Sequence, residues 1–135
     1  MDLSSLDIAK VSDEGAKCVL VHPVTQQILR DADGNEVSIT LAGTDSEAYR
    51  KAQRKLINKR LAAKGKGTIT AEQVDADDLQ ILGDCTLSWE GLLVDGVQLV
   101  CSASAAIKLY SDPRFPWIRE QATAFMNDRA NYLSD

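Results

Sequence analysis

Residues 28–60, ILRDADGNEVSITLAGTDSEAYRKAQRKLINKR, change from strand-like to helix-like patterning within a few positions, and this change decides the fold class. Val37, Ile39 and Leu41 alternate with polar residues, which is the period of a half-buried strand. The Asp-Gly pair at 33–34 favours a tight turn before that strand, because glycine readily takes a positive φ. Together with the preceding apolar run KCVLVH, this stretch predicts a small antiparallel sheet.

A helix is predicted directly after this strand. Thr44 to Glu47 has the pattern of a capping box, in which a hydroxyl and a carboxylate bond free N–H groups at a helix start. The helix is expected to end at Gly65 and Gly67, after turns rich in Lys and Arg. Its apolar side is formed by Ala48, Tyr49, Ala52, Leu56 and Ala63.

Three more helices are predicted further along the chain. A second capping box, Thr70 to Gln73, introduces a helix over 71–93 that includes Trp89 and is ended or interrupted at Gly83 or Gly91. Asp95-Gly96 then indicates a turn, and Ser102 or Ser104 caps a short helix. Pro116 suits the first turn of a terminal helix, where a missing N–H is no loss. Along that helix Ile118, Ala122, Phe125, Arg129 and Leu133 recur at helical spacing.

Grouped strands followed by grouped helices predict an α+β fold, with an N-terminal antiparallel β-hairpin or three-strand meander followed by about four α-helices. The length of 135 residues fits a single domain over 1–135. Within it, 17–43 is the β-rich part and 44–135 the helical part. Residues 1–15 fit either a short helix or a flexible arm, and the sequence leaves both open.

The composition is that of a soluble globular protein, with 44% hydrophobic and 26% charged residues. No apolar run approaches the roughly 20 residues that a membrane-spanning helix needs. The first residues, MDLSSLDIAKVSDEG, lack the basic-then-apolar order of a secretory signal. We therefore expect a cytoplasmic protein without a membrane partner.

Catalytic and metal-binding patterns are weak. Three separated cysteines and one histidine, His22, form no disulfide framework, zinc motif or nucleophile and base pair at a recognisable spacing. Asp31 to Asn35 resembles the start of a calcium loop, but Glu36 stands where glycine is needed and Ala42 where the bidentate Glu should be. A plain hairpin turn is the preferred interpretation. The sequence predicts a protein that is not an enzyme and binds no metal or cofactor.

Charge is unevenly distributed along the chain. Eight of the fifteen basic residues lie on or just beyond the helix that begins near residue 44, whereas 67–107 contains no Lys or Arg and seven acidic residues. Three interpretations stay open: solvated faces paired within one chain, a nucleic-acid site, or complementary patches between copies. The net charge of −5 disfavours nucleic acid. The basic residues are Arg50, Lys51, Arg54, Lys55, Lys59, Arg60, Lys64 and Lys66.

The terminal helix carries an unusual share of the aromatic residues, including both phenylalanines and one of two tryptophans. Its apolar stripe either packs on the chain's own core or, in part, contacts another protein chain. With the basic helix, it supplies the candidate partner-binding residues. These are Arg50, Arg54, Lys55, Trp117, Ile118, Phe125 and Arg129.

Three stretches together resemble the tail assembly chaperones of long-tailed bacteriophages and prophages: DADGNEVSITLAGTDSEAYRKAQRKLINKRL, TLSWEGLLVDG and ASAAIKLYSDPRFPWIREQATAFMNDRANYL. The resemblance extends from about Val19 onward, and the terminal run is its most specific part. The hairpin-to-helix pattern is matched by Asp33, Gly34, Val37, Ile39, Leu41, Gly43, Asp45, Ser46, Arg50 and Arg54. The closing pattern is matched by Phe115, Trp117, Ile118, Glu120, Gln121, Phe125, Asp128, Arg129, Ala130 and Asn131.

The resemblance implies a morphogenesis factor of the host bacterial cytoplasm, without enzymatic activity. Such a protein binds the tape-measure protein, keeps it soluble, helps recruit tail-tube protein through a frameshifted longer form, self-associates, and is absent from the mature virion. Two alternatives remain: a minor tail or head-tail connector protein, and a small DNA-binding regulator that uses the helix from Asp45 to Ala63. Detection in virions would favour the first, and salt-dependent duplex binding the second.

Overall fold

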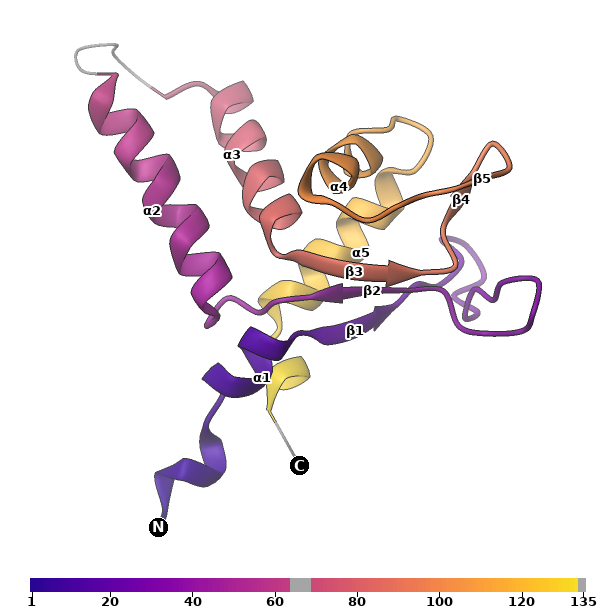
Figure 1. Ribbon diagram of the computed structural model, residues 1–135, viewed down its shortest axis with the longest axis horizontal. Coiled ribbons are helices and arrows are strands. Elements are labelled where there is room, and N and C mark those ends of the chain that lie inside the picture. The colour runs from indigo at the N-terminus through magenta and orange to yellow at the C-terminus, as the bar shows by residue number, and fades with distance from the viewer. Residues whose placement is uncertain (64–68, 134–135) are drawn as a thin grey trace.

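The computed structural model describes residues 1–63 and 69–133 and confirms the α+β class (Figure 1). A three-stranded antiparallel sheet has the order β1 (Ala16–Val19), β2 (Ser38–Leu41) and β3 (Thr86–Glu90). A short hairpin, β4 (Leu93–Val94) and β5 (Val97–Gln98), follows β3. The helices are α1 (Ala9–Glu14), α2 (Glu47–Ala62), α3 (Ala71–Asp84), α4 (Ala103–Tyr110) and α5 (Pro116–Asn127), and the 3-10 helices are η1 (Leu3–Leu6) and η2 (Arg129–Tyr132).

The third strand of the sheet lies in the stretch 71–93 that was predicted as helix, so the helix prediction is wrong for 86–90, although Gly83 was one of the two predicted ends. α3 ends at Asp84, and the chain then pairs with β2, placing Trp89 opposite Ile39. Helix over 71–93 would have left one edge of β2 unpaired, and the residues of β3 alternate Thr, Leu, Ser, Trp and Glu as a strand does. The indole N–H of Trp89 donates to the carbonyl of Leu99 at 2.9 Å, which fixes the strand against the following loop.

The turns are largely as predicted. Gly34 has a φ of 83°, and the Asp31 carboxylate accepts the backbone N–H groups of Asp33 and Asn35, each at 2.9 Å. This loop is therefore a hairpin turn closed by an aspartate side chain. Asp95 and Gly96 both have a positive φ and join β4 to β5.

The helix starts are partly as predicted. The capping box of Thr70 and Gln73 is present at α3, and Ser102 caps α4. At α2 the cap is Ser46 rather than Thr44, because the Ser46 hydroxyl accepts the N–H of Tyr49 at 3.1 Å. Pro116 occupies the first turn of α5. The predicted stop at Gly65 and Gly67 lies outside the described residues.

The core lies between the sheet and α4 and α5. Ile39 and Leu41 are fully buried, and Ile118 of α5 is 4% exposed. α5 is also tied to the loop that follows β1, since the Gln121 amide donates to the Val21 carbonyl and accepts its N–H, at 2.9 and 3.0 Å. The Tyr110 and Thr86 hydroxyls share a buried hydrogen bond of 2.8 Å, which joins α4 to β3.

The terminal helix is shorter than predicted. Asp128 is extended, with a ψ of 103°, and its carboxylate accepts the N–H of Ala130, so the helix stops at Asn127 and η2 begins. Arg129 and Leu133 therefore do not continue the helical stripe. Tyr132 instead turns into the core, and its hydroxyl donates to the carbonyl of Leu41 at 3.2 Å.

Residues 1–15 contain two short helices joined end to end. α1 packs beside η2. Its Ser12 is buried, and the Ser12 backbone carbonyl accepts the N–H of Gly43 at 3.1 Å. η1 buries no residue and extends away from the sheet (Figure 1). In the residues that the structure describes, no helix is long and apolar enough to cross a membrane.

Candidate protein-binding surface

α2 and α3 run in opposite directions and project together from one end of the sheet (Figure 1). Within α2, Ala52 is the single buried residue. The two helices are linked near their outer ends by Arg60, which makes an ion pair with Asp77 and donates to the carbonyl of Gln73. Much of this helical hairpin therefore presents its side chains to water.

Large apolar side chains remain exposed on the outer half of this hairpin. Ile57 and Leu61, one turn apart on α2, are 58% and 68% exposed, and Val74 of α3 is 49% exposed. Leu56, Ile57, Arg60, Leu61 and Asp77 line an open groove of about 260 Å³, which we call the hairpin groove. An apolar surface with a charged rim is typical of a site that binds another protein.

The two helices carry opposite charge. α2 has six basic residues and one acidic residue, and α3 has five acidic residues and no basic one. Arg60 to Asp77 is the one ion pair between them in the described chain. Lys51, Lys55 and Lys59 are exposed and make no ion pair with any described residue. The charge separation is thus only partly balanced within one chain, and a row of lysines is left facing solvent.

The structure ties three of the predicted partner-binding cations to carboxylates of the same chain. Arg50 and Arg54 both pair with Glu47, at 3.1 and 2.9 Å. The two arginines lower the pKa of the Glu47 carboxyl, chiefly through the hydrogen bond from Arg54 and then that from Arg50. Arg129 binds both oxygens of Asp45 at 2.9 Å, which attaches η2 to the start of α2. Of the predicted basic candidates, Lys55 is the one without such a partner among the described residues.

The predicted apolar candidates on α5 serve mainly the chain's own core. Ile118 is buried, so in this conformation it is not available to a partner. Trp117 and Phe125 are half-buried and pack against the core. Phe125 also meets Tyr132 edge to face, with ring centroids 5.8 Å apart. Packing on the chain's own core was one of the two interpretations of this stripe, and it accounts for most of its residues.

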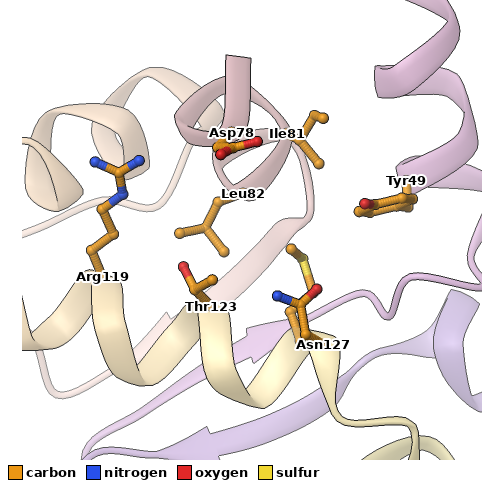
Figure 2. A pocket seen from close by; sticks show the side chains of 8 residues that line it. Tyr49, Asp78, Ile81, Leu82, Arg119, Thr123 and Asn127 are labelled. Atoms are coloured by element: carbon orange, nitrogen blue, oxygen red, sulfur yellow. The ribbon is translucent and has the colours of Figure 1, made fainter. Parts of the chain in front are cut away.

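A separate cleft of about 220 Å³ lies where α2, α3 and α5 meet. Figure 2 shows Tyr49 of α2 facing Ile81 of α3 and Asn127 of α5 across its open side. Burial, followed by the charges of Cys85 and Asp78, raises the pKa of Tyr49. Arg119 reaches from α5 to α3, where it pairs with Asp75 at 2.9 Å. The cleft thus lies at the junction between the helical hairpin and the body of the protein, and the pair of Arg119 and Asp75 connects the two.

The calcium interpretation of Asp31 to Asn35 finds no support in the loop geometry, because Asp31 is occupied with backbone N–H groups. Across residues 1–63 and 69–133, no group of three or more His, Cys, Asp or Glu side chains is arranged to hold a metal ion. The absence of enzymatic activity stays a prediction.

Sequence reasoning missed the exposed apolar residues of the hairpin groove. The predicted apolar side of α2 included Tyr49, Ala52 and Leu56 but not Ile57 or Leu61. The signal that was missed is the apolar pair Ile57 and Leu61, which are four residues apart and lie on a different side of α2 from the predicted apolar residues. Such a pair indicates a second apolar face.

Comparisons of the chain with models of protein families, with curated proteins and with solved structures find no match.

Proposed function

We propose that this chain is a tail assembly chaperone of a long-tailed bacteriophage or prophage, which binds the tape-measure protein in the host cytoplasm and keeps it soluble. It helps to recruit tail-tube protein, through a longer frameshifted form, and leaves before the virion is complete. The proposal rests on the resemblance of the sequence motifs and on one structural observation, the exposed apolar groove on a projecting, charged helical hairpin.

The hairpin groove suits an amphipathic helical client. Ile57 and Leu61 are spaced one helical turn apart, so a helix laid beside them can bury apolar side chains of its own at the same spacing. Burying a large aliphatic side chain contributes about 1.5–3 kcal/mol before ordering costs. Two or three such contacts give a weak, reversible interaction. A chaperone that must leave its client requires an interaction of this kind.

The exposed lysines of α2 do not border the groove. Lys55 and Lys59 lie roughly 120–160° around the helix from Ile57 and Leu61, and they have no carboxylate partner in the described chain. The charged residues that line the groove, Arg60 and Asp77, pair with each other. The client segments bound in the groove are therefore expected to be recognised by their apolar side chains.

Co-expression with the tape-measure protein of the same phage or prophage tests the proposal. Wild-type protein should keep the tape-measure protein in the soluble fraction, and Ile57→Asp with Leu61→Asp should lose this effect. Val97→Asp, which alters a residue 64% exposed on β5, is the matched control and should behave as wild type. An insoluble tape-measure protein in the presence of folded wild-type chain would contradict the proposal, and finding the chain in purified virions would favour a structural tail protein.

A further inference from the structure

The cleft where α2, α3 and α5 meet gathers polar side chains that have no partner in the described chain. Figure 2 shows Tyr49, Asp78, Thr123 and Asn127 arranged around it, on three different helices. None of these four side chains makes a hydrogen bond or an ion pair with another described residue. Polar groups that converge on a concave surface and are free to bind are typical of a ligand site.

The charges around the cleft do not cancel. Arg119 is neutralised by Asp75, because its Nη2 donates to the Asp75 carboxylate at 2.9 Å and to the Asp75 carbonyl at 3.3 Å. Asp78 makes no ion pair with any described residue. α3 as a whole carries five acidic residues and no basic one. The cleft therefore keeps one unpaired carboxylate, whose charge is complementary to a cation.

The rest of the cleft wall is apolar. Leu82 and Met126 are 2% and 5% exposed, and Ile81 is half-buried. Tyr49 adds an aromatic ring, and the face of such a ring attracts cations. The cleft volume of about 220 Å³ exceeds the roughly 150 Å³ of a cavity that admits benzene. The cleft thus has room for a short apolar chain with one charged end.

We propose that this cleft binds an organic cation, namely a short apolar chain that ends in an ammonium or guanidinium group. The charged end lies at the Asp78 carboxylate, and the oxygens of Thr123 and Asn127 accept its remaining N–H groups. The chain packs on Leu82 and Met126. Free amines and the Lys or Arg side chains of another protein share this chemistry. The cleft shares no lining residue with the hairpin groove, so its occupancy does not depend on the proposed chaperone function.

Titration of the full chain with pentylamine, followed by NMR of the backbone amides, tests the site. The amide signals of cleft residues on α3 and α5 should shift and saturate. Pentanol and pentanoate have the same chain without the positive charge, so they should produce smaller shifts at the same concentration. Asp78→Asn keeps the size of the side chain and removes its charge. It should weaken pentylamine binding about tenfold and leave the response to pentanol unchanged.

Glu72→Gln is the matched control, because Glu72 is an exposed carboxylate of the same helix that does not line the cleft. It should bind pentylamine as wild type does, and circular dichroism should show both variants folded. A capped peptide with one lysine between two alanines distinguishes the sources of the cation. Tighter binding than pentylamine assigns the site to a protein side chain, and weaker binding assigns it to a free amine.

Three results would overturn the cation site. These are a pentylamine titration that shifts no cleft residue, pentylamine binding no tighter than that of pentanoate, and equal affinity of Asp78→Asn and wild type for pentylamine.

Discussion

The three cysteines differ in how far water reaches them. Cys85 is fully buried and Cys18 is 4% exposed, whereas Cys101 is half-buried. Burial raises the pKa of Cys18 to about 11 and, with a smaller contribution from the charge of Asp84, that of Cys85 to about 12. Both thiols therefore act as small apolar side chains of the core.

The raised pKa values of Cys18 and Cys85 predict that the free energy of unfolding decreases at alkaline pH. A thiol that ionises near pH 9 when unfolded but near 11 or 12 when folded contributes stability that is full below about 9 and is lost as the pH rises through 11 to 12. The urea midpoint should fall between about pH 8 and about pH 10.5. The fall should be smaller in Cys18→Ala with Cys85→Ala. An equal fall of the urea midpoint in wild type and in the double variant would show that ionisation of the two thiols is not the cause.

Gln121 shows how one residue connects distant parts of the chain. Its amide binds both backbone polar groups of Val21, so α5 replaces the strand partner that Val21 lacks on that side. Glutamine offers both a donor and an acceptor, which neither glutamate nor lysine does at neutral pH. The sequence showed Gln121 as part of a motif, and the structure supplies its physical role.

At the scale of elements, α3 and α4 approach closely at Gly83. A Cβ on Gly83 would lie 2.6 Å from Cγ1 of Ile107, although alanine is the better helix former by about 1 kcal/mol. Gly83→Ala should therefore destabilise the protein by about 1–3 kcal/mol, as overpacking does. Urea unfolding followed by circular dichroism measures this change.

A second background tells whether the loss of stability in Gly83→Ala comes from the contact with Ile107 or from helix propensity. In an Ile107→Ala background the clash is removed, and Gly83→Ala should then be neutral or stabilising. A similar loss in both backgrounds would show that the contact with Ile107 is not the cause.

Local chemistry explains which elements were predictable. The capping box at Thr70 and the turn at Asp95-Gly96 were identified correctly, because each is set by neighbouring residues alone. β3 was not, because the apolar residues around Trp89 fit a helix or a strand, and its pairing partner β2 lies far away in the sequence. Likewise Asp128 ended α5 where the apolar period suggested continuation.

The candidate site was less predictable than the fold. The sequence located the basic helix but not which cations are neutralised within the chain, since Asp45 and Arg129 are brought together only by the fold. It also left the terminal stripe open between the chain's own core and a partner, whereas in the structure most of that stripe supports the core. Burial of a given side chain is a property of the assembled fold, and one helical stripe does not reveal it.

The whole molecule consists of a packed body and of projecting elements with exposed apolar side chains. The sheet with α4 and α5 forms the packed body, and the helical hairpin and η1 carry exposed apolar groups away from it (Figure 1). The buried core lies in the body, whereas Ile57 and Leu61 of the hairpin remain exposed. The proposed chaperone function would use these exposed apolar groups.

Hydrogen exchange of the chain with and without a soluble segment of the tape-measure protein measures where a client binds. Exchange should slow on binding in residues 55–61 of α2 and 71–77 of α3, because Leu56, Ile57, Arg60, Leu61 and Asp77 line the hairpin groove, and it should change little in β4 and β5. Unchanged exchange across the hairpin, or slowing confined to the opposite end of the sheet, would contradict the proposed client site.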